Sequence, residues 1–494
     1  MQFDTLPRGR PGVAPASSYA PRAQWADPSA IANHSFWSFR SDKVVVGRAN
    51  ETVLAVQDNR HLMTVAGSRA GKGVSCIIPN LLTYEGSMFV IDPKGENASI
   101  TATRRGDGEQ VSSGGLNQDV HVLDPFGVAD VPESYLSSFN PFDLLDPASP
   151  HFIDDCDSLA DALVVQSNNR ENDYWVESAR DVIRGLIIWV AAAPDEKYRD
   201  LKRIYDLLFL PTEGAEGADL ISLCAQMSVY EDVAEGVPAQ LANMLMSLSD
   251  KELSGVLATA KQQLAFLASP PMARLLSSEK HTRCVDLKRF QAHPTSIYVC
   301  LPASRLHRHA RFMRILLNML VATTERMNSQ PKIPSLLILD EMHVLGRMKV
   351  LETAAALIAG YGIRLWSFVQ DLSQLKDLYR ERWETFMGNA GLMQFFGNND
   401  LTTLKYVSER LGQTSVMKVS QGELSRQQAV GGFTGQSTSI AETALLAPHE
   451  VGYFFSRQSG NQLLLYPGAD PIFASRVVYF SDSEFKSFLK QGGR

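Results

Sequence analysis

Short apolar runs alternate with turns and helical segments along most of the chain. These runs lie at Leu62–Gly67, Ser87–Asp92, Val120–Pro125, Ser296–Pro302, Ser335–Glu341, Leu365–Asp371 and Met393–Asn398. Each is apolar at consecutive positions, which is typical of a strand that is buried on both faces. Because helical segments separate them, the sequence predicts an α/β fold with a mainly parallel sheet covered by helices.

Helical periodicity replaces these runs between residues 151 and 272. Apolar side chains recur there at Trp175, Val176, Ala179, Val182, Ile183, Leu186, Ile187 and Val190. Asp173 precedes this stripe and is a suitable helix N-cap. The stretch holds 9 basic and 20 acidic residues, so it carries −11 while the rest of the chain carries +4. We predict an all-α insertion with an acidic surface.

The two patterns divide the 494 residues into parts. We expect a flexible N-terminal arm at 1–34, the first part of the α/β domain at 35–150, the all-α insertion at 151–272 and the second part of the α/β domain at 273–494. Two stretches rich in Gly, Ser and Gln, 104–118 and 420–439, are predicted loops. Residues 461–482 are predicted to form a hairpin at a sheet edge, around a Pro-Gly turn.

Composition excludes several classes of protein. With 45% hydrophobic and 20% charged residues, the chain is neither a disordered nor a collagen-like protein. Its net charge of −7 argues against a nucleic acid held by net charge alone. The apolar stretch Gly185–Pro194 is about half of the roughly 20 residues that cross a bilayer. The 5 cysteines are far apart, which favours a reducing cytoplasm and argues against zinc or disulfide chemistry.

A glycine-containing loop with a lysine follows the run at Leu62–Gly67. The sequence there is TVAGSRAGKGVSCIIPNLL (Thr64–Leu82). In a P-loop, phosphate oxygens would bind the backbone N–H groups of Gly67, Ser68, Arg69, Ala70, Gly71, Lys72, Gly73 and Val74. Lys72 would reach the β and γ phosphates. Two positions depart from the usual pattern: Ala66 replaces the first glycine, and Gly73 replaces the hydroxyl residue that normally binds magnesium. The alternative is a Gly-rich turn with an exposed lysine.

Two carboxylates, Asp340 and Glu341, follow the apolar run that begins at Ser335. Packing alone cannot satisfy them, because burying unpaired charge is costly. In a P-loop ATPase, Asp340 would hold the magnesium ion and Glu341 would polarise the attacking water. Gln370 ends a later run, so in a parallel sheet it lies at the same edge and could sense the γ-phosphate. The alternatives are a surface carboxylate pair and a glutamine that forms hydrogen bonds at a strand end.

Other polar residues have more than one interpretation. Asp92 also ends a run, and the charged residues Lys94 and Glu96 follow it, but their local chemistry is ambiguous. A row of arginines recurs every third residue, at Arg305, Arg308, Arg311 and Arg314. On a helix this row would form either a basic face for phosphates or an ordinary solvated face.

With these motifs in place, the chain resembles the TraG/TraD-like coupling ATPases of type IV secretion and conjugation systems. The resemblance extends from about Ser35 to Phe485, through AGSRAGKGVSCIIPNLL, FVIDPKGEN, the long block from Leu336 to Tyr379, and WETFMGNAGLMQFFGNNDLTTLKYVSERLG. It implies a RecA-like motor domain interrupted by an all-α domain, usually hexameric, that uses ATP and Mg²⁺ to deliver DNA or protein substrates to a secretion channel. Glycine after the P-loop lysine is common in this family.

The resemblance also implies roles for particular residues. Lys72 corresponds to the P-loop lysine, Asp340 and Glu341 to the Walker B pair, and Gln370 to the glutamine after the next strand. Where some relatives carry a basic pair that supplies an arginine finger, this chain reads AGYG, with only Arg364 nearby.

These observations predict a cytoplasmic motor that transfers DNA, or a nucleoprotein or protein substrate, to a type IV secretion machine. Its expected partners are DNA, secretion-system or relaxosome proteins, and copies of itself in a hexamer. Typical members begin with transmembrane helices, whereas a polar arm stands here. Either a membrane protein recruits the chain in trans to the inner membrane, or the chain has a different, soluble role. The alternatives are a nucleotide-switched substrate receptor, for which the acidic insertion is suited, and a soluble HerA/FtsK-like DNA translocase.

Overall fold

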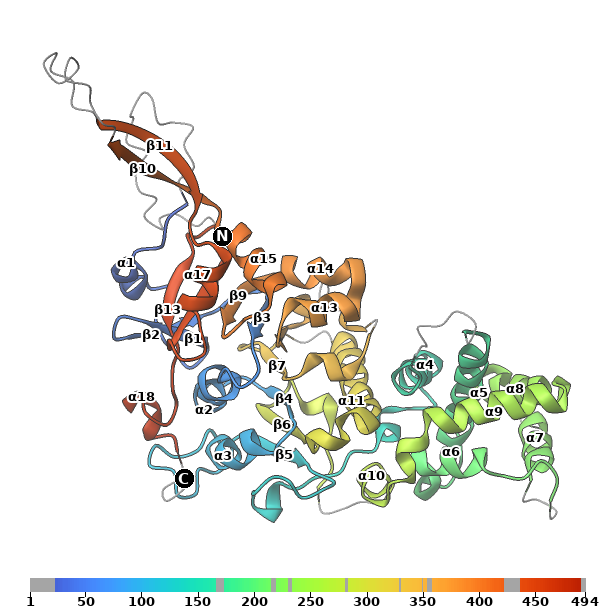
Figure 1. Cartoon of the computed structure of the whole chain (residues 1–494). Helices are drawn as coiled ribbons and strands as arrows, with labels where there is room; N and C mark the ends of the chain where they lie inside the picture. The colour runs from blue at the N-terminus through green and yellow to red at the C-terminus, as the bar shows by residue number, and fades with distance from the viewer. Residues whose placement is uncertain are drawn as a thin grey trace, which may run out of the picture. The chain divides into compact units, whose positions relative to one another are not determined.

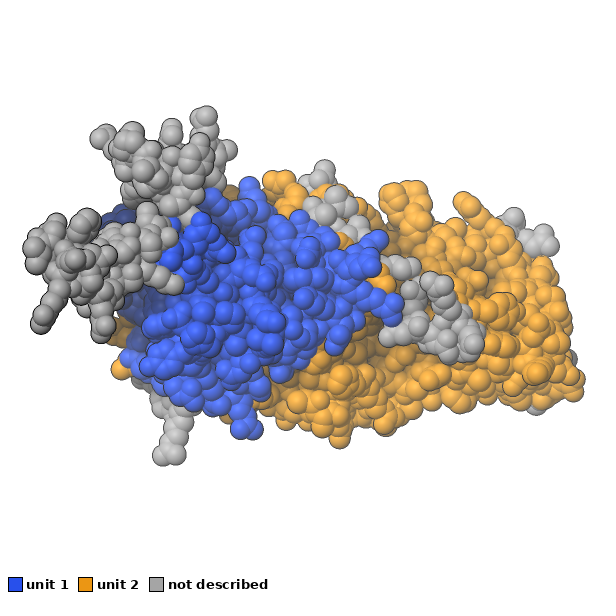
Figure 2. Space-filling view, turned by 45° about the horizontal axis from the view of Figure 1, so that its top comes forward, with its two compact units in different colours: residues 1–80, 368–482 blue, residues 81–367, 483–494 orange. Residues whose placement is uncertain are grey.

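The computed structural model describes residues 23–165, 173–214, 219–229, 233–279, 283–327, 330–348, 350–352, 358–421 and 436–489. These residues form two compact units (Figure 2). Unit 1 comprises residues 1–80 and 368–482, and unit 2 comprises residues 81–367 and 483–494. Among the described residues, no helix is both long and apolar enough to cross a membrane.

Six strands build the sheet of unit 1: β1 (Val44–Ala49), β2 (Thr52–Val56), β3 (His61–Ala66), β9 (Ala390–Phe396), β12 (Asn461–Leu465) and β13 (Ile472–Ser475). They lie in the order β2-β1-β13-β12-β9-β3. β3 and β9 are parallel, and the other neighbours are antiparallel. β10 (Gln413–Gln421) and β11 (Gln436–Ala444) form a separate antiparallel ribbon (Figure 1).

The helices of unit 1 connect these strands. They are α1 (Pro28–Asn33), the start of α2 (Ile78–Thr83), α13 (Leu372–Tyr379), α14 (Trp383–Gly388), α15 (Leu401–Leu411) and α17 (Pro448–Phe454). Aspartates cap three of them: Asp27, Asp371 and Asp400 each accept a backbone N–H from the first turn. The helix starts are therefore specified locally.

Unit 2 contains a parallel sheet of β4 (Met88–Asp92), β5 (Asp119–Leu123), β6 (Thr295–Cys300), β7 (Ser335–Leu339) and most of β8 (Ile363–Val369), whose last two residues belong to unit 1. The order is β8-β7-β4-β6-β5. β4, β6, β7 and β8 are buried along their whole length, as strands covered on both faces must be. Helix α3 (Glu96–Arg105) packs on β4, β5 and β6. Unit 2 also contains α11 (Leu306–Met327) and α18 (Ser483–Lys486).

Between β5 and β6 the chain forms a group of helices (Figure 1). They are α4 (Phe152–Leu163), α5 (Asp173–Ala191), α6 (Leu201–Leu208), α7 (Leu220–Val229), α8 (Val237–Ser247), α9 (Asp250–Gln263) and α10 (Pro270–Leu275). Helix α5 packs on α4, α6, α8 and α9 through the apolar stripe noted above, and buries Val182, Ile183 and Ile187. We refer to α4–α10 as the helical insertion.

The predicted fold class is confirmed, because each predicted run forms a strand whose ends differ from the prediction by one to a few residues. Residues of the predicted arm beyond 22 are held in unit 1: Ala23 N–H donates to Gln413 O (2.9 Å), and Trp25 packs edge-on against Phe455 and Phe473. Residues 1–22 lie outside the described residues.

The predicted hairpin at 461–482 exists as β12 and β13, but its predicted position at a sheet edge is wrong. β12 pairs with β9 on one side and β13 pairs with β1 on the other. The reason is that β1 and β2, which precede the first predicted run, cover the outer side of β13. The predicted loop at 420–439 lies largely outside the described residues, although β10 and β11 extend into its two ends.

The first two residues of the predicted loop at 104–118, Arg104 and Arg105, instead end helix α3, and both are buried. Arg105 ends α3 and is fully buried. Its guanidinium donates to the carbonyls of Leu81 (2.9 Å), Tyr84 (2.9 Å) and Gly86 (2.8 Å), and to Gln118 and Ser296. Burial lowers the pKa of Arg105 to about 10, so the side chain stays charged at neutral pH. The side chain of Arg105 thus provides hydrogen-bond donors for three backbone carbonyls at the turn between α2 and β4.

Replacing Arg105 by methionine keeps a long apolar stem but removes every donor. We expect Arg105→Met to lower the stability of unit 2 by on the order of 3–5 kcal/mol, because several buried carbonyls lose their partner. The measurement is the urea midpoint followed by far-UV circular dichroism, with the exposed Arg308→Met as the control. Equal midpoints for the two variants would contradict this role.

Candidate functional site

The loop after β3, residues 67–72, contains two residues with a left-handed backbone conformation. Arg69 has φ 56° and Gly71 has φ 97°. Ala70 N–H donates to Gly67 O (3.1 Å), and Ser75 N–H donates to Gly71 O (2.9 Å). Alternation of left-handed and right-handed residues turns successive N–H groups toward one side, which is how a backbone concavity binds anions. The loop can therefore bind phosphate oxygens through main-chain donors.

The helix after this loop starts with a π-helical turn from Gly73 to Ile77. Ile78 N–H donates to Gly73 O in this turn. Lys72 precedes it in a helical conformation and is partly exposed, whereas Ser75 is buried. π-helical turns are rare in proteins, and those that occur often lie at functional sites. The sequence contains no signal that distinguishes this turn from an ordinary α-helix start.

The turn after β9 lies directly against this loop, a contact that the sequence did not reveal. Gly67 N–H donates to Phe396 O (3.2 Å). A Cβ atom on Gly67 would overlap the carbonyl oxygen of Gly397, and one on Gly397, which has φ 66°, would lie 2.5 Å from Ala70 Cβ. Both positions therefore require glycine, since the two backbones approach too closely for a side chain.

Arg476, which follows β13, holds the same loop from another side. Its guanidinium donates to the carbonyls of Ala70 and Arg457, and lies 5.2 Å from the ring centroid of Phe396. Burial lowers the pKa of Arg476 from its usual value. This arginine turns the Ala70 carbonyl toward itself, and so helps to fix the loop. Arg476 was not among the predicted site residues, because no local motif marks it.

Gln370 belongs to unit 1 and is tied to the same turn. Its carbonyl accepts from Asn398 Nδ2 (3.1 Å), and its N–H donates to Gln374 Oε1 (3.1 Å). Asn398 directly follows Gly397, which contacts the loop at Ala70. The structure therefore connects two predicted site elements, Gln370 and the loop of Lys72, through the turn after β9.

Asp340 and Glu341 directly follow β7 in unit 2, where the sequence placed them. Both are partly buried. Glu341 has φ 63° and ψ 46°, a left-handed conformation that is strained for a residue with a side chain. Its Oε2 lies 3.2 Å from His343 Nδ1. Such strain persists only where the surroundings impose it, and it often marks a functional residue.

The ambiguity of Asp92 is resolved by its contacts. It ends β4, the neighbour of β7, and accepts from Ala98 N–H (2.9 Å) and Asn97 Nδ2 (3.4 Å) at the start of α3. Burial raises the pKa of Asp92 to about 6, and the charge of Asp340 contributes in the same direction. Lys94 and Glu96 form an exposed ion pair (3.9 Å).

The row of arginines is not one continuous face. Arg305 and Arg308 are exposed, and Arg305 lies 4.4 Å over the ring of Phe126. Arg311 and Arg314 instead point inward and donate to backbone carbonyls of α4. Both sequence interpretations are wrong for this inner pair, because the last carbonyls of α4 lack partners within their own helix.

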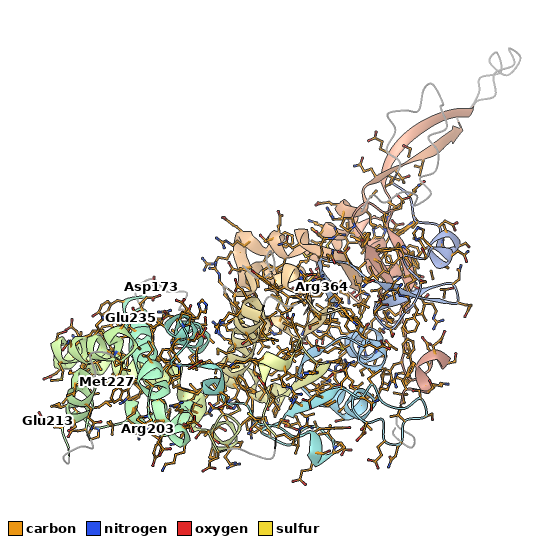
Figure 3. All side chains as sticks on the ribbon, turned by 180° about the vertical axis from the view of Figure 1, so that it is seen from behind. Asp173, Arg203, Glu213, Met227, Glu235 and Arg364 are labelled. Atoms are coloured by element: carbon orange, nitrogen blue, oxygen red, sulfur yellow. The ribbon has the colours of Figure 1, made fainter. Side chains whose placement is uncertain are left out.

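Arg364, the basic residue nearest to the AGYG segment, is buried in β8 (Figure 3). It donates to the carbonyls of Ala359 (2.7 Å) and Ile363 (3.0 Å). Its guanidinium is thus engaged within unit 2. Among the predicted site residues, Lys72 and Gln370 belong to unit 1, and Asp340 and Glu341 to unit 2.

The raised pKa of Asp92 predicts a pH dependence of stability. A carboxyl whose pKa rises from 3.8 to about 6 on folding stabilises the fold fully below pH 3.8, and this contribution is lost as the pH rises through about 6. Between pH 4 and pH 7 we expect the wild type to lose about 2 kcal/mol relative to Asp92→Asn. Urea midpoints of both proteins across this range measure the difference, and parallel curves would rule the effect out.

Comparison with known proteins places the chain in a family. The model of the family described as type IV secretory system conjugative DNA transfer matches residues 22–492. The conjugal transfer protein TraG of Escherichia coli is 26% identical over 458 residues, which cover 86% of this chain and 68% of TraG. VirD4 of Agrobacterium fabrum is 26% identical over 437 residues, which cover 85% of this chain and 59% of VirD4. The chain thus spans about three fifths to two thirds of these relatives.

Solved structures of the conjugative coupling protein TrwB share the fold. Its complex with a non-hydrolysable ATP analogue has a TM-score of 0.66 and 14% identity, and the match covers 94% of this chain and 96% of TrwB. Its complex with ADP and Mg²⁺ has a TM-score of 0.63 and 14% identity, over 90% of each chain. The expected RecA-like fold and the resemblance to type IV coupling proteins are thereby confirmed, and the chain belongs to the type IV secretory system conjugative DNA transfer family.

Proposed function

We propose that this chain is an ATP-hydrolysing coupling motor that transfers DNA, alone or with a bound protein, to a type IV secretion machine. The observation that carries the proposal is the loop from Gly67 to Lys72, which follows a buried strand and contains two residues with positive φ, Arg69 and Gly71. The chain that carries this loop belongs to the conjugative DNA transfer family. Relatives named for conjugal transfer and the nucleotide-bound structures of TrwB support it.

Each site residue has a role in this proposal. The backbone N–H groups of residues 67–74 bind phosphate oxygens, and Lys72 binds the β and γ phosphates. Asp340 holds Mg²⁺, for which a carboxylate oxygen is a preferred ligand. Glu341 orients and polarises the attacking water, and Gln370 senses the γ-phosphate. Mg²⁺ supplies positive charge that stabilises the developing charge on the transferred phosphate.

The close contact between the loop and the turn after β9 supports the phosphate-binding role. A loop that must present N–H groups at fixed positions benefits from a rigid support, and Gly397 and Arg476 provide one. The left-handed Glu341 is consistent with a residue whose position matters for chemistry. Gly397 and Glu341 both have positive φ, a conformation that costs free energy and that the packing of a turn does not by itself require.

The proposal includes partners. DNA, secretion-system or relaxosome proteins and further copies of the chain in a hexamer are expected, with recruitment to the inner membrane by another protein. The acidity lies in the helical insertion, whereas the remainder of the chain carries +4. A basic surface for phosphates on that remainder is therefore compatible with the overall charge of −7.

A second candidate function is a substrate receptor that binds nucleotide only to switch conformation. The net charge of −11 in residues 151–272 favours it, since such a surface repels DNA and suits basic proteins. Deleting residues 151–272 and measuring capture of secretion substrates separates the candidates. Unchanged capture counts against the receptor, and ATP hydrolysis stimulated by DNA counts for the motor.

The motor proposal predicts the behaviour of two variants. We expect Lys72→Ala to lose ATP binding, and Glu341→Gln to bind ATP but hydrolyse it at least about a hundredfold more slowly, because a water is no longer polarised. The measurement is phosphate release with no DNA, with single-stranded DNA and with duplex DNA. If the wild type and both variants are equally inactive in all three conditions, the motor proposal fails.

The support of the loop can be tested with a matched glycine pair. Gly397→Ala adds a Cβ at 2.5 Å from Ala70 Cβ in a left-handed residue, so the loop must shift. We expect at least about a tenfold loss of affinity for a fluorescent ATP analogue. Gly388→Ala is the control, because it lies in α14 and its Cβ has open space. Equal affinities for the two variants would refute the supporting role.

A further inference from the structure

Helices α4 and α11 of unit 2 lie antiparallel and are joined at both ends. At one end, Arg326 of α11 forms an ion pair with Asp155 of α4, whose side chain is 2% exposed. At the other end, Arg311 and Arg314 of α11 donate to the last carbonyls of α4. These carbonyls have no partner within their own helix and carry its partial negative charge, so guanidinium groups stabilise them.

Arg314 also reaches a second segment. Its Nε donates to Ala162 O (3.2 Å) in α4, and its Nη1 donates to Leu345 O (3.1 Å) and Arg347 O (2.9 Å). The residue is 5% exposed. The planar fork of a guanidinium can serve carbonyls in different directions at once, which an ammonium at a single point cannot do. One buried side chain therefore joins the helical insertion to the segment after β7.

That segment is the turn that follows the Asp340–Glu341 pair. Met342–Leu345 forms a single 3₁₀ turn that begins at the left-handed Glu341 and ends at Gly346, with φ 66°. Arg347 is held further by an ion pair with Glu352 (2.6 Å), whose side chain is 6% exposed. Because a strained residue keeps its conformation only when its surroundings impose it, the groups that hold this turn also hold Glu341.

We propose that Arg314 is a positioning residue for Glu341, and that it fixes the turn after β7 against the C-terminal end of α4. The proposal rests on the proposed function for the chemical role of Glu341. Its consequence is that the orientation of the water-polarising carboxylate depends on the docking of the helical insertion. A displacement of α4 moves the acceptor at Ala162 and, through one guanidinium, the backbone at Leu345.

Arg311 provides a matched control on the same helix. Its Nε donates to Leu163 O (3.0 Å) and its Nη2 to Gln263 Oε1 (2.7 Å). Both acceptors belong to the helical insertion. Arg311→Lys thus removes contacts between α11 and the helical insertion but leaves the bridge of Arg314 from Ala162 to the turn after β7 intact, whereas Arg314→Lys breaks this bridge. The difference between the two variants isolates the bridge to the turn.

Two measurements on the full chain test the proposal. In steady-state ATP hydrolysis, we expect Arg314→Lys to lower kcat by about ten- to a hundredfold with KM unchanged, because the misplaced carboxylate affects chemistry and not binding. Arg311→Lys should keep the wild-type kcat. In hydrogen–deuterium exchange, amides of residues 342–347 should exchange faster in Arg314→Lys and at the wild-type rate in Arg311→Lys.

The outcomes are distinct. Equal losses of kcat in both variants, a rise in KM alone, or unchanged exchange at 342–347 in Arg314→Lys would overturn the proposal. If the wild type itself hydrolyses no ATP, the proposed function fails, and the exchange pattern still decides whether Arg314 holds the turn. If Arg314→Lys does not fold, Gly346→Ala is the substitute variant. Its Cβ meets no neighbouring atom, so it causes no clash, but φ of 66° is unfavourable for alanine, so it perturbs the backbone of the same turn. It should lower kcat in the same way, and a wild-type kcat would contradict the proposal.

Discussion

Buried backbone carbonyls without helical or strand partners must be satisfied, and arginine side chains do so throughout this chain. Arg105 binds the turn between α2 and β4, Arg314 joins α4 to the turn after β7, and Arg476 holds the loop of Lys72. A guanidinium carries several donors in a fixed plane, so it can join segments that are remote in sequence. The loops that carry the candidate chemistry are therefore held by charged hydrogen bonds as well as by apolar packing.

Close backbone approach is the second constraint on the loop of Lys72. Gly67 and Gly397 contact one another where no side chain fits, and the residue after Gly397, Asn398, binds the carbonyl of Gln370. This arrangement makes the turn after β9 a common support for two predicted site elements. The loop tolerates Ala66 in place of the first glycine of the usual pattern for a separate reason. Ala66 is the last residue of β3 and is buried like the other residues of this strand.

In this chain a group of helices is inserted between two strands of the parallel sheet, β5 and β6. The structure shows in unit 2 how such an insertion is attached: its first helix, α4, lies along α11 and ends at Arg311 and Arg314. A row of arginines at helical spacing suggests a phosphate-binding face. Two of its members instead bind the carbonyls at the C-terminal end of α4, and one of these two, Arg314, also joins the insertion to the turn after Glu341.

The strands β3–β9, the glycine-containing loop of Lys72 and the position of the Asp340–Glu341 pair after a strand were predictable from the sequence, because burial on both faces produces consecutive apolar residues and the two motifs are local. The strands β1, β2, β10 and β11 were not predicted. The contacts of Gly397 and Arg476 and the bridge of Arg314 were not predictable, since each of these residues contacts residues far away in the sequence. The hairpin of β12 and β13 was predicted as a pair but not as an interior one. Local patterns determined which elements form, and only tertiary packing decided which backbone groups each element leaves unsatisfied and which side chain satisfies them.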